Sequence, residues 1–118
     1  MGIRVTGGML RGRIIDSPSG LSVRPTGART REAVFNILQD VSGFSVLDLF
    51  AGSGIMGIEA ISRGASSVVA VENNRKQAIS LRNNYRKLQI ENNLTLWERD
   101  VLSLEFSHEK KTFDLKII

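Results

Sequence analysis

Hydrophobic and polar residues follow two different patterns along the chain, one typical of strands and one typical of helices, and the first third contains both. Residues 3–5 and 11–15 are short β-prone stretches on either side of Gly7-Gly8, which predicts a small N-terminal hairpin. Farther along, Thr30 is placed to cap a helix that ends by Asp40, because apolar residues there recur at helical spacing. Those apolar residues are Val34, Ile37 and Leu38.

The rest of the chain alternates strands with helices through short loops. A first helix reaches about Ser62 and is stopped by Gly64, and a second covers residues 75–88 with Ala78, Leu81, Tyr85 and Leu88 on one face. The predicted strands cover residues 46–49, 68–71, 94–97 and 113–118. This alternation predicts an α/β fold, an open Rossmann-like parallel sheet whose ligand lies at the carboxyl ends of the strands.

The strongest local signal is the segment 46–54, in which Asp48 precedes a glycine turn that opens a helix. Gly52 and Gly54 keep side chains out of the turn, so backbone amides at the helix start can approach an anionic group, while Asp48 attracts a cation. S-adenosylmethionine carries a carboxylate, an ammonium and a sulfonium, whereas Asp48 would repel a pyrophosphate. The run from Gly52 to Gly57 also matches the dinucleotide pattern GxGxxG, so an NAD(P)-binding oxidoreductase domain is the alternative.

Two further acidic residues follow strands. Glu72 ends the second predicted strand of the sheet, close to the position about 20 residues downstream where a ribose-binding acid belongs in both nucleotide folds. Asp100, after the third strand, is placed to accept a hydrogen bond from an adenine amino group, with Val101 offering a backbone amide and an apolar wall. Together these acids predict a nucleoside-containing ligand.

Positive charge is concentrated at the N-terminus of the chain. The formal net charge is +4, yet the first 31 residues hold six arginines against Asp16 alone, which leaves 10 basic and 11 acidic residues in the remainder. A basic arm on a nearly neutral body suits a protein that meets a phosphate backbone with one face, and arginine forks phosphate well. A solvated N-terminus is the alternative reading.

Length and composition restrict the classes of protein that remain. A chain of 118 residues predicts one domain, which we divide into a basic arm at residues 1–25 and a cofactor-binding part at residues 26–118. No apolar run reaches the roughly 18 residues of a membrane span, so a cytoplasmic location is expected. Without cysteine, and with His108 as the single histidine in a polar loop, no metal site is expected.

The chain resembles the bacterial small-subunit ribosomal RNA guanine-N2 methyltransferases of the RsmD type, over essentially its whole length. The matching segments are Arg11-Gly12-Arg13, Arg24-Pro25-Thr26 with Arg29, Arg31-Glu32-Ala33, Phe35-Asn36-Ile37-Leu38, residues 47–54, Gly57-Ile58-Glu59-Ala60, Ser62-Arg63-Gly64-Ala65 and Val71-Glu72. Together they are far more specific than a glycine motif.

The resemblance implies a class I fold and metal-free methyl transfer from S-adenosylmethionine to the exocyclic amine of a guanine in assembling small ribosomal subunits. The cofactor-binding residues that follow are Arg24, Pro25, Thr26, Asp48, Phe50, Ala51, Gly52, Ser53, Gly54, Glu72, Asn73, Asp100 and Val101. The RNA-binding residues expected with the basic arm are Arg4, Arg11, Arg13, Arg29 and Arg31.

Two departures from the family pattern are visible. Gly27-Ala28 stands where a Thr-Asp pair is usual, which puts one N-terminal polar contact in doubt. Phe113-Asp114-Leu115 resembles the strand before the family's Asp-Pro-Pro-Tyr motif, which holds the target amine and stacks on the base, but Lys116-Ile117-Ile118 follows. We therefore expect the catalytic motif beyond Ile118, and a catalytically silent cofactor- or RNA-binding fragment is a third alternative. An uncovered final strand also favours self-association.

Overall fold

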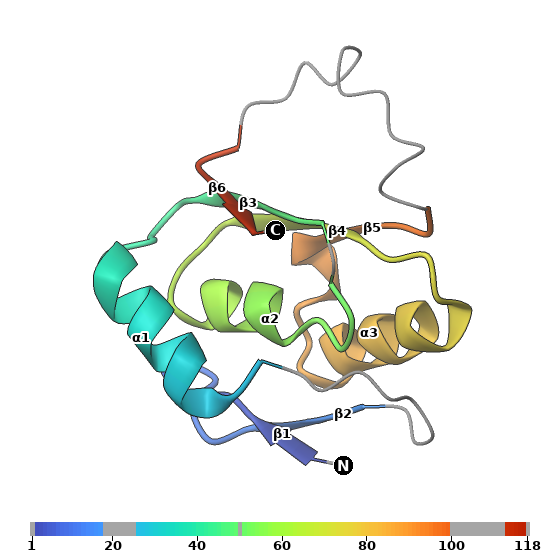
Figure 1. Ribbon diagram of the computed structural model, residues 1–118, viewed down its shortest axis with the longest axis horizontal. Helices are drawn as coiled ribbons and strands as arrows, with labels where there is room; N and C mark the ends of the chain where they lie inside the picture. Colours follow the sequence, from blue (N-terminus) through green and yellow to red (C-terminus); the bar gives the residue numbers. More distant parts are fainter. Residues whose placement is uncertain (1, 18–25, 50, 100–112, 118) are drawn as a thin grey trace.

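A computed structural model describes residues 2–17, 26–49, 51–99 and 113–117, and its elements alternate as the sequence predicts (Figure 1). In chain order they are β1 (Gly2–Arg4), β2 (Ile14–Asp16), α1 (Ala28–Leu38), β3 (Ser45–Asp48), α2 (Ile55–Ser62), β4 (Ser67–Val71), α3 (Arg75–Lys87), the 3-10 turn η1 (Glu91–Asn93), β5 (Leu94–Trp97) and β6 (Leu115–Ile117). The predicted division into residues 1–25 and 26–118 stays a prediction, because residues 18–25 lie outside the described ranges.

Four of the strands form one parallel sheet in the order β5-β4-β3-β6. Asp48 at the end of β3 pairs with Ala70 on one side and with Ile117 on the other. The chain therefore leaves β3 toward β4 and β5 and later returns to the opposite side of β3. Such a reversal of strand order marks the carboxyl end of β3 as the preferred ligand position in an open α/β sheet, and the predicted α/β fold is confirmed.

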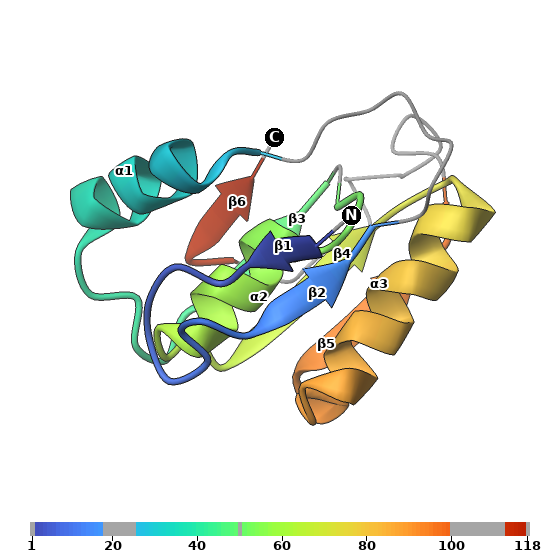
Figure 2. The ribbon, with the colours of Figure 1, turned by 90° about the horizontal axis from the view of Figure 1, so that it is seen from below.

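The elements stack in layers on one side of the sheet. Helices α2 and α3 cover one face, and the β1–β2 hairpin lies on the far side of these helices (Figures 1 and 2). The main core fills the space between the layers, and its buried members include Ile3, Ile15, Val46, Ile58, Val68, Leu81 and Tyr85. A smaller apolar cluster on the opposite face contains Leu47, Val69 and Val71, with Trp97 and Phe113 packed against it. Both sheet faces are thus apolar.

The strand at each edge of this sheet has one partner among the described residues. β6 pairs only with β3, and β5 pairs only with β4. The expected self-association through an uncovered edge stays a prediction.

Helix α1 departs from its predicted start and buried face. It begins at Ala28 after Gly27, which offers no side-chain cap, so the prediction that Thr30 caps it is wrong. Phe35 and Arg31 point into the protein, being 1% and 2% exposed, whereas Ile37 is 81% exposed. The apolar-periodicity rule fails here because a charged side chain occupies an inward position, which requires a buried counter-charge.

Helix α3 follows its prediction closely. Ala78, Leu81, Tyr85 and Leu88 are all buried, as their spacing indicates. The helix begins after Asn74, whose side chain accepts a hydrogen bond from the amide of Gln77 at 3.0 Å, and such an N-cap satisfies one of the first free amides of a helix. Its N-terminus therefore lies fixed beside the carboxyl end of β4.

Candidate functional site

A glycine turn connects the carboxyl end of β3 to the first turn of α2. The backbone adopts left-handed conformations at Gly52 (φ 56°) and at Gly54 (φ 87°). A residue with a Cβ pays about 1–2 kcal/mol in this region, so glycine is the natural choice at both positions. The turn is tied to the neighbouring strand, since the amide of Ala51 donates to the carbonyl of Val71 at 3.2 Å.

The two glycines serve different purposes. Among the described residues, no atom lies within 4 Å of a Cβ built on Gly52, so none of them fills the space beside the turn there. A Cβ on Gly54 would lie 2.8 Å from Cγ of Leu81, and one on Gly57 would lie 2.5 Å from the hydroxyl of Tyr85. The expected close approach of a ligand thus fits the Gly52 side, whereas Gly54 and Gly57 allow α2 to pack against α3.

Glu72 joins the glycine turn to the start of α3. Its Oε1 accepts a hydrogen bond from the amide of Gly52 at 2.8 Å, and its Oε2 accepts one from the amide of Asn74 at 2.9 Å. A carboxylate offers about four acceptor positions, so each oxygen keeps capacity for one more donor. The half-buried Glu72 therefore lies at the site edge that the sequence indicates, and it also organises the turn itself.

Asp48 is a buried carboxylate at the carboxyl end of β3, with 3% of its surface exposed. Burial raises the pKa of the Tyr85 hydroxyl, and the charge of Asp48 raises it further. A carboxylate at the strand end that leads into the turn favours a cationic group in a ligand bound there.

Asn84 is a buried polar residue beside the glycine turn that sequence reasoning missed. It lies on α3 with 2% exposed surface, and its Nδ2 donates to the carbonyls of Asp16 at 2.8 Å and Ser53 at 3.2 Å. Its Oδ1 accepts from the amide of Asp16 at 3.0 Å. One carboxamide thus connects the end of β2 to the glycine turn. The signal available in the sequence was a polar residue at the spacing of the buried helix face, between Leu81 and Tyr85.

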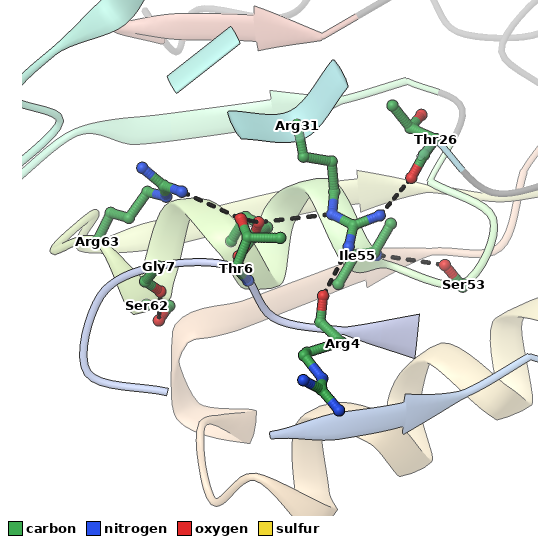
Figure 3. Close-up of polar contacts among 10 residues, drawn as sticks. Arg4, Thr6, Gly7, Thr26, Arg31, Ser53, Ile55, Ser62 and Arg63 are labelled. Carbon is green, nitrogen blue, oxygen red and sulfur yellow. Dashed lines mark hydrogen bonds and ion pairs between the residues drawn. The ribbon is translucent and has the colours of Figure 1, made fainter. Parts of the chain in front are cut away.

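Arg31 corrects one prediction for the RNA-binding set. Its guanidinium is buried, with Nε 3.5 Å from Oε2 of Glu59, a residue that is fully buried. Nη2 donates to the carbonyl of Arg4 at 2.6 Å, and Nη1 donates to the carbonyl of Thr26 (Figure 3). Arg31 therefore joins the hairpin, the segment before α1 and helix α2. Its assignment to RNA contact is wrong because its charge is used inside the protein.

The same carboxylate fixes the hairpin to α2. The amide of Thr6 donates to Oε1 of Glu59 at 2.7 Å, and the Thr6 hydroxyl donates to Oε2. Arg63 donates to the Thr6 hydroxyl oxygen at 3.1 Å, and its guanidinium lies 4.8 Å from the centre of the Phe35 ring. We call this group, with Arg31, the hairpin junction. No local sequence motif predicts it.

One turn further along α2, a serine receives the hairpin loop. The Ser62 hydroxyl donates to the carbonyl of Gly7 at 2.5 Å and accepts from the amide of Leu10 at 2.9 Å. Gly8 has φ 78°, and a Cβ on it would lie 2.0 Å from the carbonyl oxygen of Ser62. Only glycine fits at this contact, which explains the Gly7-Gly8 pair in the predicted hairpin.

The other predicted site residues fall into three groups. Arg4, Arg11, Arg13 and Arg29 are exposed, as are Thr26 and Asn73, while Ala51 and Ser53 are buried in the turn. Arg24, Pro25, Phe50, Asp100 and Val101 lie outside the described residues. Within the described ranges, no three His, Asp or Glu side chains gather as a ligand set for a metal ion. None of the helices in those ranges is long and apolar enough to cross a membrane.

The chain matches both a protein-family model and curated relatives. A family model described as conserved hypothetical protein 95 matches residues 3–118. Ribosomal RNA small subunit methyltransferase D of Escherichia coli (strain K12) is 41% identical to the chain over 91 residues, which are 76% of this chain and 46% of that protein. The chain spans about half the length of the curated relatives it matches.

Solved structures extend the likeness to three dimensions. The yhhF protein from Escherichia coli is 35% identical with a TM-score of 0.78, and the match covers 87% of this chain and 55% of that one. A SAM-dependent O-methyltransferase from Thermotoga maritima is 20% identical with a TM-score of 0.67, covering 80% of this chain and 35% of that one. The second likeness shows the fold alone.

Proposed function

The chain belongs to the family described as conserved hypothetical protein 95, whose curated relatives include ribosomal RNA small subunit methyltransferase D, and on that premise we propose that it forms the cofactor-binding part of a ribosomal RNA methyltransferase. The hydrogen bond from the amide of Gly52 to Glu72 carries the proposal. It places an acid and an open glycine turn side by side at the carboxyl end of β3, where the strand order reverses.

The proposed cofactor is S-adenosylmethionine, which supplies an activated methyl group when bound. Asp48 and the turn around Gly52 would hold its charged methionine end, and Glu72 would accept hydrogen bonds from the ribose hydroxyls. The spare acceptor capacity of Glu72 and the open space beside Gly52 fit this assignment. The remaining proposed contacts are the adenine contacts of Asp100 and Val101, the methionine-end contacts of Phe50 and the cover over the cofactor from Arg24, Pro25 and Thr26.

The proposed substrate is the exocyclic amine of a guanine in small-subunit ribosomal RNA, in a cytoplasmic setting. Arg4, Arg11, Arg13 and Arg29 are exposed and carry charge suited to phosphate contacts. Methyl transfer then depends on holding the amine in line with the methyl group, so orientation accounts for much of the rate. The Asp-Pro-Pro-Tyr segment that the family resemblance implies for holding the amine does not occur in the 118 residues.

One observation favours a second candidate, a dinucleotide-binding domain. Gly57 packs tightly, with a Cβ there 2.5 Å from the Tyr85 hydroxyl, as the third glycine of GxGxxG does in that class. Asp48 opposes this candidate because a buried carboxylate at the strand end that leads into the turn would repel a pyrophosphate. We therefore rank it below the methyltransferase.

A labelled methyl-transfer assay tests the proposed function. The protein is incubated with labelled S-adenosylmethionine and unmodified small-subunit ribosomal RNA, and the RNA is digested to nucleosides and analysed by mass spectrometry. Label in N2-methylguanosine is the result expected of a protein that carries this cofactor-binding part together with an Asp-Pro-Pro-Tyr segment. Label in another nucleoside would overturn the guanine-N2 assignment. Tight binding of cofactor and RNA without transfer would show a catalytically silent binding fragment instead.

A further inference from the structure

A groove lies between the end of β2 and residues of α3, two elements that run side by side in Figures 1 and 2. Its volume is about 420 Å³, and its lining residues are Asp16, Ser17, Lys76, Ile79, Ser80, Asn83 and Asn84. We call it the β2–α3 groove. Its volume lies within the range of about 300–1,000 Å³ that is typical of small-molecule sites, so a single nucleotide is an occupant of suitable size.

The groove offers three kinds of contact that the fold itself leaves available. Lys76 and Asn83 are exposed and make no ion pair or hydrogen bond with any of the described residues, and 48% of the Ile79 surface is exposed between them. By contrast, Arg75 and Arg82 lie within 3.9 Å of Glu98, so their charges are partly paired. The groove thus combines a free cation, a free amide and an apolar platform.

Its acidic member does not exclude an anionic ligand. The carboxylate of Asp16 lies 3.7 Å from Nζ of Lys87, so its charge is offset at the rim. Its oxygens can still accept a hydrogen bond from a base amino group, as carboxylates do when they read a base edge. The lining therefore matches both a phosphate and the polar edge of a base.

We infer that the β2–α3 groove binds one unpaired nucleotide of the RNA substrate, an inference that rests on the proposed function. Ile79 would support the base, Asn83 and Asp16 would meet its polar edge, and Lys76 would meet its phosphate. RNA bases that are read by proteins are mostly splayed out of single-stranded segments, and a concave pocket accepts such a base but not a base inside a duplex. The exposed Arg4 on the adjoining hairpin extends the basic surface.

Asn84 gives the groove a direct connection to the cofactor site. The residue forms part of the groove lining, and its Nδ2 donates to Ser53 in the glycine turn at 3.2 Å. A nucleotide that fixes this carboxamide also fixes the turn. Binding of RNA and of S-adenosylhomocysteine should therefore be cooperative, and each should raise the affinity of the other by the same factor.

The test measures fluorescence anisotropy of a short labelled RNA, presented single-stranded and annealed to its complement. Ile79→Asp should weaken single-strand binding by about fivefold or more, because it replaces the platform with a charge that repels phosphate. Ile37→Asp is the matched control, since Ile37 is an exposed isoleucine on α1 and is 81% exposed. Its affinity should stay close to that of the wild type. Thermal unfolding confirms that both variants are folded.

A second pair of variants tests the phosphate contact. Lys76→Met should lower the slope of log affinity against log salt by about 0.7, the value for one phosphate contact on a single strand. Lys116→Met, an exposed lysine on β6, should leave the slope unchanged.

Three outcomes overturn the inference in distinguishable ways. If Ile79→Asp and Lys76→Met bind as the wild type does while an Arg11→Ala/Arg13→Ala variant loses affinity, the groove is wrong and the RNA function stands. If the wild type binds no RNA, the RNA part of the proposed function itself fails. If Ile79→Asp changes only the oligomeric state measured by light scattering, the groove is a protein interface.

Discussion

The carboxyl edge of the sheet and the hairpin junction are built on opposite principles. At the sheet edge, Gly52 and Glu72 meet through a backbone amide, and space remains open beside the turn. At the hairpin junction, the charged side chains of Arg31 and Glu59 lie buried and serve three chain segments at once. The first arrangement leaves capacity for a ligand, whereas the second consumes nearly all of its polar capacity inside the protein.

This difference explains why charged side chains have different roles in the two regions. An acid at the end of a strand keeps free acceptor positions because the backbone donors it meets are few. Both terminal nitrogens of the buried Arg31 donate to carbonyls inside the protein, and removing its ion-pair partner leaves an uncompensated charge in a poorly solvated place. Stability should therefore depend on the hairpin junction, and ligand affinity on the sheet edge.

The largest effect should come from breaking the hairpin junction. Arg31→Met leaves Glu59 buried without its counter-charge, so the free energy of unfolding should fall by about 3–5 kcal/mol. Urea denaturation measures this loss. Arg29→Met, an exposed arginine on the same helix, is the control and should change stability by less than about 0.5 kcal/mol. Equal losses in the two variants would contradict the structural role of Arg31.

Alanine substitutions at the two glycines of the turn should distinguish the effect of packing on stability from the effect of backbone conformation. Gly54→Ala should lower the free energy of unfolding by about 2–4 kcal/mol, since it adds a Cβ against Leu81 to the cost of a left-handed backbone. Gly52→Ala pays only the backbone cost, about 1–2 kcal/mol. Both are measured by urea denaturation. If Gly52→Ala were less stable than Gly54→Ala, Gly52 rather than Gly54 would be the glycine that packs against neighbouring side chains.

The sheet edge should respond in affinity rather than in stability. Glu72→Ala should weaken S-adenosylhomocysteine binding by about 1.5–3 kcal/mol in calorimetry, because hydrogen bonds to a charged group are lost. Glu91→Ala, an exposed acid on η1, serves as the control and should leave the affinity unchanged. An unaltered affinity in Glu72→Ala would remove the ribose assignment.

The free energy of unfolding at alkaline pH should depend on Tyr85, the single tyrosine, which is buried against Gly54 and Gly57. The pKa of Tyr85 is raised in the folded state, so the folded protein holds its proton more tightly than the unfolded chain does. Its contribution to stability is complete below the unfolded pKa of about 10 and falls by about 1.4 kcal/mol per pH unit above it. Denaturation at several alkaline pH values measures the slope, and Tyr85→Phe should show a shallower one. Identical slopes would contradict burial of the hydroxyl.

The sequence predicts the sheet edge well because its signals are local. The strand ending at Asp48, the glycine turn and Glu72 each follow from residue type and spacing within one βαβ unit. The buried face of α1 could not be predicted because it depends on Glu59, which is 28 residues from Arg31 in the chain and adjacent to it in space. The contacts of Asn84 could not be predicted for the same reason, since both of its partners lie outside α3.

The most direct test of the cofactor assignment is a calorimetric titration of the wild-type protein with S-adenosylhomocysteine and, separately, with NAD. We predict that S-adenosylhomocysteine binds one site per chain and raises the temperature of unfolding, while NAD does neither, because Asp48 lies at the strand end that leads into the turn that a pyrophosphate would have to contact. Binding and heat stabilisation by NAD alone would contradict the account and identify the glycine turn as a dinucleotide site.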